Sequence, residues 1–194
     1  MAGAYANLTA LAQEAGTDVG TLRRWQQQDG WLDLMGQVLV KTSGTDRPTF
    51  QAMSAIPGAA SMQGYLWSAT VLQWVQIDYH VDHDIKLGSV LYPHVHFRPL
   101  TNAAGVVRWG FEYSVSKDHG QTTGFPATTT VYVNFNVPAN SLGTHFVAEV
   151  ATAGDIPSTN IEPDSVIHMR VFRDAANAAD TYTGAVCCWQ ADLQ

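Results

Sequence analysis

Three segments of the chain alternate apolar and polar residues with a period of two, the pattern of a strand that buries one face. In residues 106–116 the apolar side chains are Val107, Trp109, Phe111, Tyr113 and Val115. The polar side chains between them are Arg108, Glu112, Ser114 and Ser116. Residues 71–81 and 128–137 repeat this alternation. We therefore expect three long strands whose odd-numbered side chains face a common core.

Shorter runs predict further strands at residues 37–41, 65–69, 91–98, 146–151, 166–173 and 183–190. Turn-forming residues lie between strands at 102–105, 119–124, 140–143, 154–157 and 174–180. Eight or nine evenly spaced strands without helical crossovers indicate antiparallel sheets. We predict a mainly β chain, an antiparallel β-sandwich of jelly-roll type, because this is a common closed arrangement of that many strands. An immunoglobulin-like sandwich is the main alternative, but its Cys-Trp-Cys core pattern is missing.

The start of the chain follows a helical period instead. Leu8, Leu11 and Ala15 share one side of a short helix, and Leu22 and Trp25 share one side of a second. Two helices this short have too little apolar surface to be stable alone in water. We therefore expect them to be ordered by docking on another surface.

Residues 11–25 resemble the helix-turn-helix pattern of phage and bacterial DNA-binding proteins. Arg23 and Arg24 are its only basic residues. The alternative is an arm that packs on a neighbouring subunit. We assign residues 1–32 to a helical N-terminal arm and residues 33–194 to the sandwich.

Charged residues are scarce in this chain. They make up 14 % of it, against a usual share of about 25 %, and the formal net charge is −7. Nucleic-acid affinity comes mainly from Lys and Arg, so we expect no nucleic-acid partner. Cys187 and Cys188 would point to opposite faces of a strand, which makes them a poor disulfide pair and indicates a reducing compartment. Without an apolar run of about 18 residues or a basic-then-apolar leader, we expect synthesis in the cytoplasm and no membrane partner.

Two histidines on one strand are the most conspicuous candidates for chemistry. His94 and His96 share a face, as the paired imidazoles of a cupin-type metal site do. A catalytic metal needs at least three protein ligands, and residues 97–107 contain no Asp, Glu or His. His145 or His168 would complete a site only through a proximity that the sequence does not predict. We therefore expect the imidazoles to bond to neighbours or meet another subunit, and no transition metal to copurify stoichiometrically.

Other polar residues give weaker signals. His80 and His83 would fall on opposite faces of a strand, and a solvated loop is the simpler interpretation of that stretch. We interpret four acidic side chains as surface residues: Asp78, Asp84, Glu112 and Glu149. The chain contains neither a G-x-S-x-G nucleophile motif nor a phosphate-binding glycine loop before a helix. We assign no catalytic, cofactor-binding or metal-binding residue and expect no cofactor.

Across most of residues 31–192 the chain resembles jelly-roll virion proteins of tailed bacteriophages, of the capsid cement or decoration type. The resemblance rests on Trp31–Leu34, Gly88, Tyr92–Phe97, Gly105–Trp109, Glu112–Tyr113, Ile161–Ser165, Met169–Asp174 and Asp180–Tyr182. It implies a structural role without chemistry, location in the virion, and binding to the major capsid protein as a homotrimer.

The first functional hypothesis is therefore a structural phage protein that binds the capsid as a self-associated cement. Low charge and the outward Trp74 suit a surface that pairs with other subunits, although a loop covering Trp74 is an equal alternative. A cupin-like metal enzyme using His94 and His96 is the second hypothesis. The third is a receptor- or glycan-binding virion protein, which the sequence does not separate from a cement because both are sandwiches with aromatic patches.

Overall fold

The structure is a computed structural model that describes residues 33–40, 43–54, 56, 62–83, 85, 88–117, 125–151 and 154–194. Strands in this part of the chain are β1 (Leu34–Met35), β2 (Gln37–Leu39), β3 (Thr49–Ala52), β4 (Gln63–Trp67), β5 (Gln73–His80), β6 (Pro93–Pro99), β7 (Gly105–Ser116), β8 (Thr129–Val137), β9 (Phe146–Glu149), β10 (Val166–Arg173) and β11 (Val186–Leu193). The 3-10 turn η2 (Ser158–Asn160) precedes β10.

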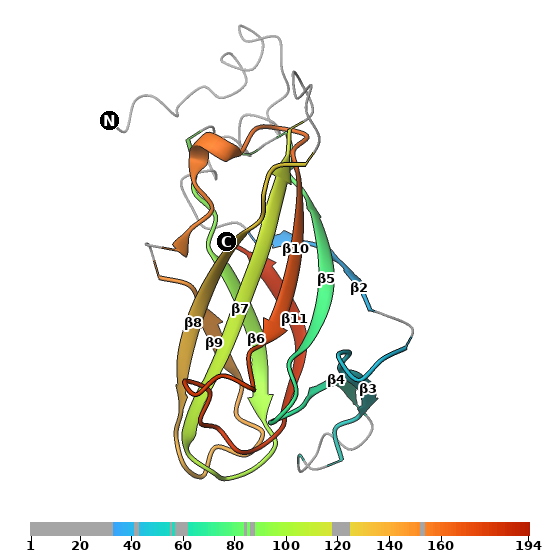
Figure 1. Cartoon of the computed structure of the whole chain (residues 1–194), viewed down its shortest axis with the longest axis vertical. Coiled ribbons are helices and arrows are strands. Elements are labelled where there is room, and N and C mark those ends of the chain that lie inside the picture. The colour runs from blue at the N-terminus through green and yellow to red at the C-terminus, as the bar shows by residue number, and fades with distance from the viewer. Residues whose placement is uncertain are drawn as a thin grey trace, which may run out of the picture.

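The strands form two antiparallel sheets that pack face to face, which confirms the predicted sandwich of jelly-roll type. One sheet has the order β3-β4-β11-β6-β9, with β1 also pairing with β11. The other has the order β2-β5-β10-β7-β8. Figure 1 looks onto the five-stranded sheet, with β6, β9 and β11 behind it. Within the described ranges, the chain has no helix of the length and apolarity needed to span a bilayer.

The core lies between the sheets and follows the predicted alternation. Val107, Trp109 and Phe111 of β7 have no exposed surface. Trp109 packs edge-on against Trp67 of β4 across the two sheets, with ring centroids 5.1 Å apart. Burying each such side chain is worth roughly 1.5–3 kcal/mol, so these inward rows hold the sheets together. Arg108 and Glu112 lie on the opposite face of β7, as expected.

The ends of the sandwich differ from the prediction in two ways. The last strand was expected at residues 183–190 but begins at Val186 and runs to Leu193. A register shift between Cys188 and Gln190 breaks the period of two there, which hides the end of the strand in the sequence. Strands β1 and β3 were not predicted, because one has two residues and the other has no buried face. The expected helices of residues 1–32 lie outside the described residues.

Cys187 and Cys188 point to opposite faces of β11, as predicted. Cys188 belongs to the core between the sheets, whereas Cys187 packs with Met53 and Ile56 on the outer side of the six-stranded sheet. Both thiols are free and buried. Burial is the main reason why the pKa of Cys187 rises to about 11, so this thiol stays protonated at neutral pH.

Candidate functional site

The outer face of the five-stranded sheet carries a row of aromatic side chains. The antiparallel register sets Trp74 of β5 beside Phe172 of β10, Phe172 beside Gly110 of β7, and Gly110 beside Tyr132 of β8. We call Trp74, Phe172 and Tyr132 the aromatic row. It crosses β5, β10, β7 and β8, neighbouring strands of the sheet that lies nearest the viewer in Figure 1.

Gly110 makes room for the middle ring of this row. A methyl group at this position would collide with the Phe172 ring, so the absent side chain lets that ring lie across β7. Phe172 reaches Tyr132 in an edge-on contact with centroids 5.8 Å apart. Phe172 is thereby buried, while Tyr132 keeps 43 % of its surface exposed. Tyr132 is thus the accessible end of the row.

Arg108 holds Tyr132 from one side. Its guanidinium carbon lies 3.9 Å from the centre of the Tyr132 ring. The group donates hydrogen bonds to Asp174 at 3.2 Å and to Asn134 at 3.0 Å. These bonds fix the planar guanidinium over the ring, an arrangement in which a cation–π contact is favourable.

A second arginine borders the row on its other side. Arg170 of β10 forms an ion pair with Glu112 of β7 at 2.5 Å. Its guanidinium also lies 5.2 Å from the Phe172 ring centre and 5.8 Å from that of Trp74. Glu112 in addition accepts a hydrogen bond from Thr128 at 2.9 Å. The aromatic row is thus flanked on both sides by planar polar groups held in place.

Trp74 is outward-facing, as predicted, but it is also held by the segment before β3. Its indole N–H donates to Asp46 at 3.1 Å, and its backbone N–H donates to the Asp46 carbonyl at 3.0 Å. The ring is half-buried. The segment around Asp46 therefore holds this tryptophan in place.

The six-stranded sheet carries a different cluster on its outer face. His94 and His96 of β6 lie beside Asp192 and Gln190 of β11 in the sheet register. The Nε2 atoms of His94 and His96 lie 2.5 and 3.6 Å from Oδ1 of Asp192. The two histidines therefore share a face, as predicted, and Asp192 is a third polar group that the sequence did not indicate. We call His94, His96 and Asp192 the imidazole cluster.

The pKa values in the imidazole cluster reflect burial and the carboxylate together. Burial alone would lower the pKa of His94, but contact with Asp192 outweighs it and the pKa is raised. For His96 burial is the largest effect and lowers the pKa, with the neighbouring imidazoles adding to the shift. Burial would raise the pKa of Asp192, yet His94 lowers it below its usual value. Contact between His94 and Asp192 thus favours the charged form of each side chain.

The structure agrees with the loop interpretation of a second pair of histidines, because β5 ends at the first of them. His80 and His83 both reach Oδ1 of Asp164, at 3.3 and 3.0 Å. Strand β5 ends at His80, so the alternation no longer governs His83. Both side chains are largely exposed, in keeping with the predicted loop.

The remaining candidate side chains belong to neither the aromatic row nor the imidazole cluster. His168 contacts Asp78 at 3.0 Å on the outer face of the five-stranded sheet. Glu149 is exposed on β9. Asp84, like Arg23 and Arg24 of the predicted DNA-binding segment, falls outside the described residues.

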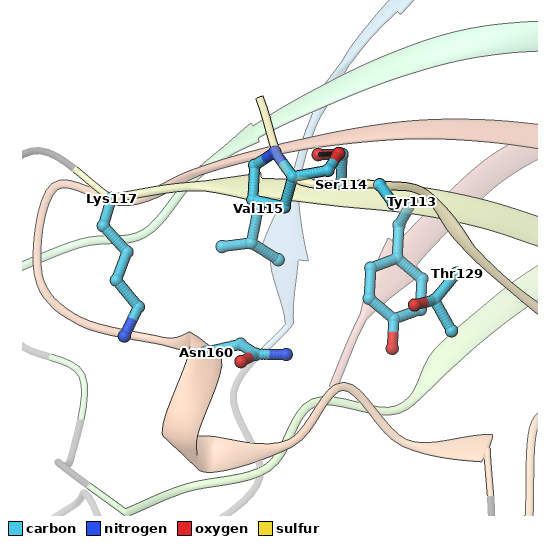
Figure 2. Close-up of a pocket in the computed structure, with 8 residues that line it drawn as sticks. Tyr113, Ser114, Val115, Lys117, Thr129 and Asn160 are labelled. Carbon is cyan, nitrogen blue, oxygen red and sulfur yellow. Dashed lines mark hydrogen bonds between the residues drawn. The ribbon is translucent and has the colours of Figure 1, made fainter. Parts of the chain in front are cut away.

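A surface pocket lies where β7 ends beside η2 (Figure 2). It is lined by Tyr113, Ser114, Val115, Lys117, Pro126, Ala127, Thr129 and Asn160. Lys117 donates a hydrogen bond to the Thr159 carbonyl at 2.8 Å. Burial of the ring raises the pKa of Tyr113, so its hydroxyl stays protonated at neutral pH. The pocket thus offers neutral hydrogen-bonding groups and one lysine already held by backbone.

Comparison with known proteins does not assign this chain to a family. No protein-family model and no curated protein matches the sequence. Solved structures with similar folds include a family 11 carbohydrate-binding module from Clostridium thermocellum in complex with a mixed-linked tetrasaccharide, at 10 % identity and a TM-score of 0.41, covering 84 % of this chain and 96 % of that one. A family 30 carbohydrate-binding module of a cellulosomal cellulase from the same organism has 11 % identity and a TM-score of 0.42, covering 84 % and 92 %.

A cleaved adhesin domain of Lys-gingipain from Porphyromonas gingivalis is similar at 9 % identity and a TM-score of 0.37, covering 84 % of this chain and 97 % of that one. These values are too low to bear on the function of this chain. Any functional conclusion must come from its own residues.

Proposed function

We propose that this protein is a non-catalytic glycan-binding β-sandwich and that the outer face of its five-stranded sheet is the binding surface. The observation that carries the proposal is the aromatic row, with Tyr132 as its accessible end and arginine–carboxylate pairs on both sides. This develops the glycan-binding alternative of the sequence analysis rather than its leading hypothesis.

The chemistry of a sugar ring matches this face. One side of a pyranose ring presents C–H groups that pack on an aromatic ring, and its hydroxyls both donate and accept hydrogen bonds. Arg108 and Asn134 lie next to Tyr132, and beyond their mutual bond Arg108 keeps N–H donors while the exposed Asn134 keeps both amide donors and acceptor capacity on its oxygen. Because these side chains are already held in place, binding costs little side-chain entropy.

The charge pattern favours a neutral ligand. Arg108 is paired with Asp174, and Arg170 with Glu112. Neither arginine is left with an uncompensated charge that would attract a phosphate or sulfate group. We therefore expect neutral polysaccharides or oligosaccharides rather than acidic ones.

The test is binding of the full-length protein to an array of neutral and acidic glycans, followed by titration calorimetry with the glycans that bind. We expect Tyr132→Ala to weaken binding about tenfold to thirtyfold, the loss of one interface hot spot. Phe50→Ala is the matched control, because Phe50 is an exposed aromatic residue of the other sheet. Absence of any bound glycan, or equal binding by Tyr132→Ala, would contradict the proposal.

We propose the self-associating virion role, with copies of the chain and the major capsid protein as partners, as a second candidate. It is supported by the sheet edge at β3, whose four residues are all exposed and uncharged. Edge strands without charges pair readily with other chains. Phe50 on this edge and Met62 beside it expose 56 % and 55 % of their surfaces. Location in the virion still rests on the sequence resemblance alone.

A further inference from the structure

The three residues of the imidazole cluster are potential metal ligands that lie close together on the outer face of the six-stranded sheet. One ligand atom from each of His94, His96 and Asp192 lies within 4.8 Å of the other two. We propose that these residues bind one divalent transition-metal ion, for which Zn²⁺ is the best match. The site lies on the sheet opposite the aromatic row, so this inference is independent of the proposed glycan binding.

The ligand set has the composition of a known class of site. Two imidazoles and one carboxylate bind Zn²⁺ and related ions, with bonds of about 2.0–2.2 Å. Tetrahedral geometry at those lengths sets ligand atoms roughly 3.3–3.5 Å apart. The 3.6 Å between His96 and Asp192 already fits, whereas the 2.5 Å between His94 and Asp192 must widen by about 1 Å.

The outer contacts of the ligands hold them in a metal-binding orientation. Nδ1 of His94 lies 3.4 Å from the Tyr92 carbonyl, and Nδ1 of His96 lies 2.9 Å from Nε2 of His145. The Nε2 atoms of both rings are thereby directed at Asp192. Gln190 donates a hydrogen bond to the other carboxylate oxygen of Asp192. Metal-binding histidines and carboxylates are generally held by such second contacts.

The Asp192 carboxylate is incompletely satisfied by hydrogen bonds. Its side chain is completely buried, and among the residues that the structure describes Oδ1 has no hydrogen-bond donor of acceptable angle. Burying a carboxylate is costly unless a positive charge or well-aligned donors compensate it. A metal ion on Oδ1 supplies that charge without the angular requirement of a hydrogen bond.

An ion also has a path into the site. The His96 side chain is 20 % exposed, so the cluster opens to solvent on that side. Glu149 lies next to His94 in the sheet register and is exposed. Its negative charge favours the approach of a cation. Three protein ligands leave a fourth coordination position for water or an outside ligand.

The test uses Zn²⁺ as the probe with full-length protein that carries no histidine tag. After treatment with a chelator and dialysis, titration calorimetry at pH 7.5 should give one Zn²⁺ per chain, and Zn²⁺ should raise the melting temperature. His96→Ala and Asp192→Asn should each weaken binding at least tenfold and abolish the shift. His83→Ala is the matched control, because His83 contacts Asp164 in a similar but exposed pair.

Cobalt provides a second measurement. Co²⁺ in this site should produce visible absorption bands that disappear in His96→Ala and persist in His83→Ala. His96 is the least buried of the three ligands, so its variant decides the question if Asp192→Asn does not fold. Absence of stoichiometric Zn²⁺ binding, full binding by folded His96→Ala, or loss of binding in His83→Ala would each overturn the proposal.

Discussion

Arg173 occupies a position in β10 where the alternation of the strand calls for an apolar side chain. Ile167, Met169 and Val171 point into the core before it, and Arg173 follows them without exposed surface. Its guanidinium makes two bonds of 2.9 Å to Asp180, whose side chain is also fully buried. A buried charge is tolerated only with such complete pairing.

The remaining donors of Arg173 bond to the loop after β10. They reach the carbonyls of Gly184 at 2.8 Å and Tyr182 at 2.6 Å. Asp180 also accepts a hydrogen bond from the Arg108 backbone at 3.0 Å. These hydrogen bonds hold the loop against the ends of β10 and β7, next to the Arg108 side chain of the proposed glycan surface.

We predict that Arg173→Met lowers the free energy of unfolding by about 3–5 kcal/mol, because it leaves the Asp180 carboxylate buried without its partner. Urea unfolding followed by circular dichroism measures this change. Arg170→Met is the control, since the Arg170–Glu112 pair is partly exposed and should contribute at most about 1 kcal/mol. Equal stability of the two variants would show that the Arg173 pair is not a structural requirement.

At the scale of the elements, β7 and β10 fit together through a glycine. Gly110 is a strand position without a side chain, and the Phe172 ring of the neighbouring strand fills the space above it. This is why a bulky aromatic residue on the outer face of a sheet is buried to 97 % of its surface. The aromatic row depends on this pairing of a glycine with a ring.

We predict that Gly110→Ala destabilises the protein. Alanine in a strand gains about 0.5–1 kcal/mol over glycine, but overpacking against the ring costs typically 1–3 kcal/mol. The net loss should be about 1 kcal/mol. Combining it with Phe172→Leu should reduce the cost of the alanine, and a double-mutant cycle of melting curves should show a coupling above about 0.5 kcal/mol. Additive effects would contradict the proposed contact.

At the scale of the molecule, the two sheets expose different kinds of surface. The outer face of the five-stranded sheet has paired charges, whereas β3 at the edge of the other sheet has neither charge nor cover in the described part of the chain. The exposed Phe50 on this edge lies 5.0 Å from the Tyr65 ring of β4. Such an edge is a natural place for a second copy to pair.

We predict that the protein self-associates through this edge. Light scattering behind a sizing column should give a multiple of the 21.1 kDa chain mass, with three copies as the expectation from the virion resemblance. Phe50→Glu should shift the mass toward one chain, because a buried unpaired carboxylate opposes association. A stable interface should bury at least about 1,000 Å² in total. A single-chain mass at micromolar concentration would contradict the prediction.

Many residues of the proposed sites were predicted individually from the sequence. The alternation predicted that Arg108, Glu112 and Tyr132 face outward, and that His94 and His96 share a face. It did not predict that Phe172 lies over Gly110, since the two residues belong to β10 and β7, which are separated along the chain by β8 and β9. Nor did it predict Asp192, because the register shift before Gln190 removes the period that would have marked the strand.

The sequence by itself determined the strand periods, and therefore which side chains of each long strand enter the core. This is so because the direction of a side chain in a strand depends only on its neighbours along the chain. Only the tertiary structure decided which strands lie side by side. The meeting of His94 with Asp192 and of Gly110 with Phe172 depends on that pairing, which is set by the packing of two whole sheets rather than by any local pattern.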